Sequence, residues 1–356
     1  MKKRMGTALL LALCGWTVAR EAAACTTFCL KDQEALLFGK NYDWSVDDAL
    51  LVVNKRGVAK TAMLPPKDRP ATWVSKYGSV TFNQYGREFP NGGMNEAGLV
   101  VELMWLDDTR YPDPDGRPGL DCLEWIQYQL DRFDRVEDVV REAGRVRIVS
   151  MAKIHYLVCD RTGACATIEF LDGRLVPHSG GELPVPVLTN HTYAESLGYL
   201  RRSEAAPGSK AFEGGSSLAR FARASSLLRS YRPGPGGKPP VDYAFDVLDS
   251  VAQGPYTQWS IVYDLRSKRV HYRTRENRAI RRFDLAAFDF SCSTPVKVLD
   301  IHQGAGDVAR RFAAYRPEAN RDLVARSFRG TEFLAGVPSE EIAAVAAHPQ
   351  STSCRR

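Results

Sequence analysis

Apolar positions along the chain recur with two periods, and the change from one to the other predicts a mixture of strands and helices. Short apolar runs bounded by Gly, Asp, Asn and Pro are typical of strands, and the run over residues 98–105 is expected to be buried on both faces. Apolar residues at three- and four-residue steps predict helices instead. The expected strands cover residues 35–38, 49–53, 72–75, 79–84, 98–105, 154–158, 166–170, 185–188, 259–264 and 269–272, and the expected helices cover residues 120–133, 136–142, 217–231 and 243–252.

The order of these elements decides the fold class. Runs of strands are separated by runs of helices, which favours a layered α+β fold over a parallel α/β sheet. Strands 259–264 and 269–272 are expected to pair as a hairpin. From about Gly304 the pattern becomes helical and polar, so residues 301–356 are predicted to form a helical C-terminal extension of a main domain over residues 25–300.

The first residues have the layout of a secretory signal peptide. Basic residues 2–4 precede an apolar run over residues 6–18, and an alanine triplet at residues 22–24 provides a small-residue cleavage site. Residues 1–24 are therefore expected to be removed, and the mature chain is expected to be exported to the periplasm or the extracellular space. No later apolar run reaches the roughly 18 residues that a membrane-spanning helix needs, so no transmembrane segment is expected in the mature chain.

Cleavage after Ala24 places Cys25 at the new amino terminus. One residue then carries both a thiol and a free α-amine, and the α-amine titrates near pH 8, well below a lysine. At working pH it can accept the proton of the thiol and later deliver that proton to a leaving amine. This is the N-terminal nucleophile arrangement, in which the amine of the chain replaces the histidine of a catalytic triad.

Other interpretations of the cysteines stay open at this point. Cys25 is an ordinary structural cysteine in one of them, and in another it is acylated, so that the chain is a lipid-anchored or secreted binding protein without turnover. A lipoprotein signal usually has a large aliphatic residue shortly before the cysteine, whereas Ala22 stands here. A papain-like cysteine protease is the nearest enzymatic alternative, but no papain-type signature surrounds Cys122 or Cys292.

Charge and cysteine content exclude some functions. Removal of residues 1–24 takes away a net charge of +3 from the total of +6, and the remaining balance gives no argument for nucleic-acid binding. Cys159 and Cys165 flank a turn-like stretch and are placed to face each other across a hairpin. Zinc is the competing interpretation because His155 lies nearby, but no second ligand pair with finger spacing exists. No metal or cofactor is expected.

Five short motifs carry a resemblance through their order and spacing. They are Cys-Thr-Thr-Phe at 25–28, Gly-Lys-Asn-Tyr-Asp-Trp at 39–44, Gly-Met-Asn-Glu-Ala-Gly-Leu at 93–99, Leu-Thr-Asn at 188–190 and Ala-Arg-Phe at 219–221. Beyond the first, each alone reads as ordinary turn or helix sequence. Together they make the chain, from Cys25 to about Leu299, resemble the choloylglycine hydrolase family, which includes bile salt hydrolases and penicillin V acylases.

The resemblance implies a fold, an activity and a set of site residues. The fold is the four-layer αββα sandwich of N-terminal nucleophile hydrolases, and the activity is hydrolysis of a linear amide. Cys25 would be the nucleophile, and Asp43 would hold its α-amine and thiol in position. Asn91 and Asn190 would donate hydrogen bonds to the oxyanion, and Arg220 would support the site electrostatically. Lys40 would supply positive charge at the site.

Two departures from the family pattern stand out. The family usually has arginine where this chain has Lys40, and lysine keeps the positive charge that favours a thiolate but lacks the planar bidentate fork. The segment between Asn190 and Arg220 is shorter than in the tetrameric bile salt hydrolases, where a hairpin builds the assembly. The resemblance implies a homo-oligomer, but the shortened segment argues against the tetramer of the bile salt hydrolases.

The substrate is only narrowed to a class. Conjugated bile salts, penicillin V and N-acyl homoserine lactones all present an apolar acyl group on an amide. Tyr42, Met104 and Trp105 are candidates for the lining of an acyl pocket, although a plain core role is equally open. The extension and the shortened segment favour a substrate other than bile salts.

Overall fold

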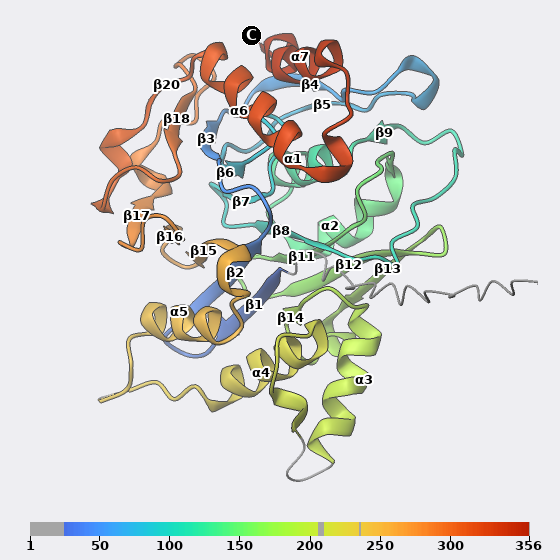
Figure 1. The fold of residues 1–356 in the computed structure, drawn as a ribbon. Helices are drawn as coiled ribbons and strands as arrows, with labels where there is room; N and C mark the ends of the chain where they lie inside the picture. Colours follow the sequence, from blue (N-terminus) through green and yellow to red (C-terminus); the bar gives the residue numbers. More distant parts are fainter. Residues whose placement is uncertain (1–24, 206–209, 235, 356) are drawn as a thin grey trace, which may run out of the picture.

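Two sheets lie face to face and have helices on their outer sides (Figure 1). The computed structural model describes residues 25–205, 210–234 and 236–355, so the predicted signal peptide lies outside the described residues. Within these residues, seven strands form the first sheet and nine form the second. The first sheet has the order β14 (Val187–Leu188), β1 (Thr26–Lys31), β2 (Leu36–Asp43), β15 (Thr257–Asp264), β16 (Arg269–Thr274), β17 (Arg281–Asp284) and β19 (Gly306–Asp307).

The second sheet carries the middle of the chain. Its order is β13 (Arg174–Ser179), β12 (Cys165–Leu171), β11 (Ile154–Cys159), β8 (Val100–Trp105), β7 (Gly92–Asn95), β6 (Ser79–Asn83), β3 (Leu50–Asn54), β18 (Lys297–Asp300) and β20 (Ala313–Ala314). Two small sheets lie outside this pair. They join β21 (Ser353–Cys354), β4 (Val58–Thr61) and β5 (Thr72–Val74) in one, and β10 (Arg147–Ile148) and β9 (Gly119–Leu120) in the other.

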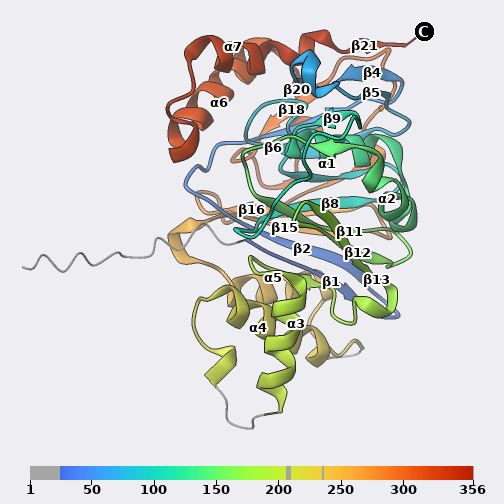
Figure 2. The ribbon, with the colours of Figure 1, turned by 90° about the vertical axis from the view of Figure 1, so that its right-hand side faces the viewer.

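Helices cover both outer faces of the sandwich. Figure 2 shows α3 (Tyr193–Glu204), α4 (Ser217–Ser230) and α5 (Pro240–Ser250) below the strands β1, β2 and β15 of the first sheet. On the far side, α1 (Cys122–Arg132) packs on β7 and β8, and α2 (Val136–Glu142) packs on β12. The layered α+β fold predicted from the sequence is therefore confirmed.

The hairpin of β1 and β2 determines where the candidate site forms. The two strands are antiparallel, with Phe28 opposite Gly39 and Thr26 opposite Asn41. The ring of Phe28 occupies the space that a side chain at Gly39 would need, so glycine is required there for close packing. Since β15 pairs with the other edge of β2, the polar residues up to Asp43 are buried inside the sheet.

Two predicted boundaries need correction. The strand expected over residues 35–38 continues to Asp43 as β2, because β1 and β15 supply hydrogen-bond partners on both of its edges. The helical pattern expected from about Gly304 begins at Pro317, because β19 and β20 first extend the two sheets. The predicted hairpin of residues 259–264 and 269–272 is confirmed as β15 and β16.

The end of the chain forms a helical unit with a small core of its own. It consists of α6 (Pro317–Gly330), the 3₁₀ turn η8 (Glu332–Leu334) and α7 (Ser339–Ala347), which pack together through Val324, Ile342 and Ala346. Below, "the C-terminal extension" means residues 317–355. No helix among the described residues is both long enough and apolar enough to cross a bilayer.

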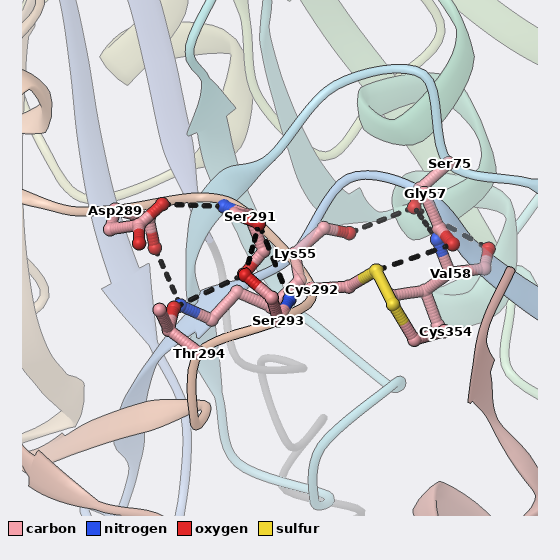
Figure 3. Close-up of a disulfide and its surroundings, with 10 residues drawn as sticks. All are labelled: Lys55, Gly57, Val58, Ser75, Asp289, Ser291, Cys292, Ser293, Thr294 and Cys354. Atoms are coloured by element: carbon pink, nitrogen blue, oxygen red, sulfur yellow. Dashed lines mark hydrogen bonds between the residues drawn. A yellow bond between two sulfur atoms is a disulfide. The ribbon is translucent and has the colours of Figure 1, made fainter. Parts of the chain in front are cut away.

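Two disulfides join parts of the described chain. Cys159 and Cys165 face each other across the β11–β12 hairpin, which confirms that predicted pair. Cys292 is bonded to Cys354 near the end of the chain, and Figure 3 shows this bond beside Gly57 and Val58 at the start of β4. The second disulfide therefore ties the C-terminal extension to the sandwich.

Candidate active site

Cys25 lies at the start of β1 and is only 2% exposed. Its Sγ donates to the backbone carbonyl of Asp43, at the end of the neighbouring strand β2, at 3.9 Å. Burial raises the pKa of the thiol, whereas the charges of Lys40 and Arg220 oppose that shift. The hairpin thus brings Lys40 and Asp43 within electrostatic range of the sulfur, and α4 brings Arg220.

Arg220 connects the cysteine to the candidate oxyanion donor Asn190. Its buried guanidinium projects from the first turn of α4 and donates to the carbonyl of Cys25 at 2.8 Å through Nη1. Through Nη2 it donates to Oδ1 of Asn190, also at 2.8 Å. The planar fork of arginine suits this double role, so Arg220 fixes the position of both residues at once.

Asp43 has one carboxylate oxygen with a partner and one without. Oδ1 accepts a hydrogen bond from Oγ1 of Thr257 on β15, while Oδ2 is buried and finds no hydrogen-bond partner among the described residues. Burial raises the pKa of this carboxyl to about 6, against the opposing effects of Arg220, Thr257 and Lys40. A buried carboxylate oxygen without a partner is costly, so this oxygen calls for a donor.

Lys40 is paired with an acid that the sequence analysis did not single out. Its buried Nζ lies 3.9 Å from Oε2 of Glu102 on β8 and also donates to the carbonyl of Leu103. The hydroxyl of Tyr263 donates to the other oxygen of Glu102 at 2.6 Å. Burial raises the pKa of Glu102 to about 7, although Lys40 and Tyr263 oppose that shift.

A signal for this pair was present in the sequence. Glu102 is the one ionisable residue in the run 98–105, which was expected to be buried on both faces. A charged side chain in a doubly buried strand requires a partner of opposite charge. Gly92 on the adjacent strand β7 leaves room for the carboxylate, since a side chain there would overlap Glu102.

The two asparagines are held by different parts of the fold. Asn91 accepts from the backbone of Gln84 at 2.8 Å and donates to the hydroxyl of Tyr42 at 3.1 Å. Asn190 follows β14 and donates to the carbonyl of Trp105 at 2.8 Å. Each carboxamide carries two N–H donors, and these bonds use one of each.

A mainly apolar cavity of about 270 Å³ opens beside the cysteine. Cys25 and Asn91 lie on its wall, whereas Lys40, Asp43, Asn190 and Arg220 are not among the lining residues. The other lining residues are Tyr42, Trp44, Met63, Leu64, Tyr85, Phe89, Leu103, Trp105, Asp121, Cys122, Leu123, Ser150, Met151, Ala152, Ile154, Phe328, Phe333, Leu334 and Val345.

The expected pocket residues divide into two groups. Tyr42 and Trp105 line the cavity, as the sequence suggested. Met104 instead lies in the core with its sulfur 3.7 Å from Nζ of Lys40, so the core interpretation holds for that residue. His155, considered as a zinc ligand, contacts Glu169 and the carbonyl of Thr189 in the buried interior.

Fold and sequence together define the class of protein. The sequence profile of the linear amide C–N hydrolases, choloylglycine hydrolase family, matches residues 25–298. The chain therefore belongs to the choloylglycine hydrolase family, and the resemblance noted in its motifs is confirmed. The αββα arrangement is that of the N-terminal nucleophile hydrolases of this family.

Particular relatives narrow the comparison further. The penicillin V acylase of Pectobacterium atrosepticum is 27% identical over 262 residues, which cover 62% of this chain and 69% of the relative. The structure of the penicillin V acylase of Agrobacterium tumefaciens superimposes with a TM-score of 0.71 at 29% identity, covering 82% of this chain and 98% of that one. The conjugated bile acid hydrolase of Clostridium perfringens shares the fold, with a TM-score of 0.66 at 17% identity over 79% of this chain and 98% of that one.

Proposed function

We propose that this chain hydrolyses the amide bond of an N-acyl substrate with Cys25 as an N-terminal nucleophile. The substrate class comprises penicillin V, N-acyl homoserine lactones and conjugated bile salts. The observation that carries the proposal is the thiol of Cys25 at the wall of an apolar cavity, next to a buried Asp43 oxygen that lacks a donor. An α-ammonium group on a processed Cys25 is a donor of the required charge.

In the proposed reaction, Cys25 Sγ attacks the acyl carbonyl while the α-amine takes the thiol proton. The oxyanion forms beside Asn91 and Asn190, and the unused N–H donors stabilise it; one such donor is typically worth about 3–4 kcal/mol in the barrier. Collapse breaks the C–N bond, and the α-ammonium protonates the leaving amine. Water then attacks the thioester with the same amine as base and releases the carboxylic acid.

The cavity favours a compact acyl group within that class. Its volume of about 270 Å³ lies just below the range of roughly 300–1,000 Å³ for pockets that hold drug-sized ligands. Trp44 and Trp105 present aromatic surface there, and their ring centroids lie 6.0 Å apart. A phenoxyacetyl group or a medium-length aliphatic chain therefore suits this site better than a steroid.

We also propose that the chain is exported after removal of residues 1–24. The two disulfides, Cys159–Cys165 and Cys292–Cys354, support this localisation because such bonds persist mainly in oxidising compartments. Lipid attachment at Cys25 is the alternative outcome of the same processing step. It would convert the amine and thiol into groups unable to serve in the reaction.

Processing provides the first test of the mechanism. Intact mass of the exported protein should correspond to a chain that begins at a free Cys25, and this form should hydrolyse penicillin V. A form that keeps Ala24 should be inactive, because its Cys25 nitrogen is an amide without basicity. Turnover by the form that begins at Ala24 would refute the role of the amine, and a thioether-linked lipid on Cys25 would support the anchored alternative.

A second test concerns the pH dependence that Asp43 imposes. Its pKa is raised to about 6, so the carboxyl is neutral below that pH and charged above it. The adjacent α-ammonium of a processed chain lowers this value, so the acylation rate should rise as pH increases through a value at or below about 6. Asp43→Asn should lose this acidic limb and more than about tenfold in rate, or roughly 1.4 kcal/mol in the barrier.

The measurement is the pH–rate profile of acylation on a chromogenic N-acyl substrate. Asp47→Asn is the matched control, because Asp47 lies on the loop after β2 and pairs with Arg275 rather than with the cysteine. Its profile should match that of the unmodified enzyme. An unchanged rate and profile in Asp43→Asn would mean that Asp43 is a structural residue of the strand.

A further inference from the structure

The C-terminal extension supplies one wall of the cavity that holds Cys25. Four of the lining residues, Phe328, Phe333, Leu334 and Val345, come from α6, η8 and α7. All four lie beyond residue 298, where the match to the family ends. Figure 1 shows these helices in red above the sheets, at the end of the molecule opposite α3 and α4. The cavity is therefore built jointly by the family domain and by a segment outside the family match.

Phe333 forms an aromatic cluster with two residues next to the reacting groups. Its ring centroid lies 6.4 Å from that of Trp44 and 5.7 Å from that of Trp105. Trp44 directly follows Asp43, and the carbonyl of Trp105 accepts the hydrogen bond from Asn190. The side chain at position 333 thus borders the space where the acyl group of a substrate would lie.

Specific polar contacts hold the extension against the residues that follow β2. The hydroxyl of Tyr85 bridges the indole nitrogen of Trp44, at 2.9 Å, and Oγ1 of Thr331, at 2.8 Å. Arg326 forms an ion pair with Asp48 at 2.7 Å. These contacts fix the register of η8 relative to Trp44, so Phe333 meets the cavity at a defined place.

Phe333 is nevertheless 43% exposed, although its ring has two aromatic neighbours, Trp44 and Trp105. A large apolar side chain at the rim of an apolar cavity gains buried surface only when an apolar ligand covers it. The ring lies at the rim instead of inside the small core of Val324, Ile342 and Ala346. Its exposure is therefore explained by contact with a ligand better than by packing of the extension.

We propose that the C-terminal extension, chiefly through Phe333, selects the acyl group of the substrate by completing the apolar pocket around its distal part. This inference rests on the proposed function, because it assigns a substrate preference to the same site. Aromatic or medium-length aliphatic acyl groups reach Phe333 and gain affinity from it. An acetyl group remains beside Cys25 and gains none.

The test compares acyl groups on one leaving amine, the N-acetyl and N-phenoxyacetyl derivatives of 4-nitroaniline, with the processed enzyme. In Phe333→Ala, kcat/KM for the phenoxyacetyl compound should fall about tenfold, mostly through KM, in line with the cost of lost apolar contact in a pocket. For the acetyl compound it should stay within about twofold. Ile280→Ala is the matched control, since Ile280 is similarly exposed at 39% and does not line the cavity.

Phe333→Leu guards against loss of folding, since it keeps an apolar side chain and should show a smaller shift in the same direction. Equal changes for the two acyl groups, or no change for either, would overturn the inference. A decrease for the acetyl compound alone would overturn it as well.

A binding measurement separates this inference from the proposed reaction. Decanoate is titrated into the Cys25→Ala protein by calorimetry, with and without Phe333→Ala. Decanoate binding that weakens about tenfold in Phe333→Ala supports a role of Phe333 in binding the acyl group. This holds even if the unmodified enzyme hydrolyses no amide and the proposed function fails. Two results would overturn the inference about Phe333 and leave the proposed reaction unaffected. In both, the amides are hydrolysed, and decanoate either binds equally well with and without Phe333→Ala or does not bind.

Discussion

Cys25→Ala is expected to abolish amide hydrolysis, with a loss in kcat on the order of 10⁶-fold, as is typical when the nucleophile of a catalytic unit is removed. Cys25→Ser should lose most of the activity, because an alkoxide is far harder to generate near neutral pH than a thiolate. Steady-state hydrolysis and single-turnover acylation of the processed variants measure both losses.

Cys29→Ala is the matched control for this experiment. Cys29 is a buried free thiol on the same strand, but it does not line the cavity. The control should retain activity, which separates loss of the nucleophile from loss of a buried sulfur. Measurable turnover by purified Cys25→Ala would contradict the mechanism.

Lys40→Met is expected to lower the free energy of unfolding by about 3–5 kcal/mol, because it leaves the charge of buried Glu102 without its cation. It should also slow alkylation of Cys25 at neutral pH. Burial raises the pKa of that thiol and Lys40 opposes the shift, so removal of the lysine raises the pKa further. Denaturant unfolding and iodoacetamide kinetics measure the two effects separately.

The double variant Lys40→Met/Glu102→Gln separates the two roles of Lys40. It removes both charges, so most of the lost stability should return, while alkylation of Cys25 should remain slow. Lys40→Arg keeps the positive charge and should keep the alkylation rate within about tenfold. If thiol reactivity returns together with stability in the double variant, then Lys40 acts only by packing and not by its charge.

Local sequence patterns predicted much of the fold because burial has a regular signature. The helix α2 (Val136–Glu142) was predicted with the observed bounds, and the β15–β16 hairpin was predicted as two neighbouring strands. The strand β1 (Thr26–Lys31) was not predicted, because it directly follows the cleavage site and was treated as a motif. The helix α3 (Tyr193–Glu204) was missed as well, since its buried positions include Ser196 and Ser203 and its apolar stripe is weak.

The candidate site likewise contains residues that the sequence identified and partners that only the structure identifies. Cys25 and Arg220 were named from motifs, and Asn91 from the family resemblance. In the structure Cys25 and Asn91 line the same cavity, and Arg220 donates to the backbone carbonyl of Cys25. Their catalytic roles remain predictions. The partners Thr257 and Glu102 could not be paired from sequence, because Thr257 lies 214 residues from Asp43 and only the sheet register brings them together.

The contribution of the C-terminal extension was beyond the reach of local patterns for a related reason. Phe333 meets Trp44 across nearly the whole chain, and no periodicity encodes a contact between segments so far apart. The polar helical pattern predicted a C-terminal extension, but it did not indicate which part of the main domain the extension contacts. Only the folded arrangement shows that α6 and η8 face the cavity.

The joint construction of the cavity affects the order in which the enzyme matures. Synthesis proceeds from the amino end, so the segment that bears Cys25 is made well before residues 317–355. A nascent chain that lacks those residues has its thiol but no Phe333 wall, and Cys292 then has no Cys354 with which to bond. Completion of the pocket thus requires synthesis to continue through the C-terminal extension, so a chain terminated before residue 317 would carry a nucleophile with an open pocket.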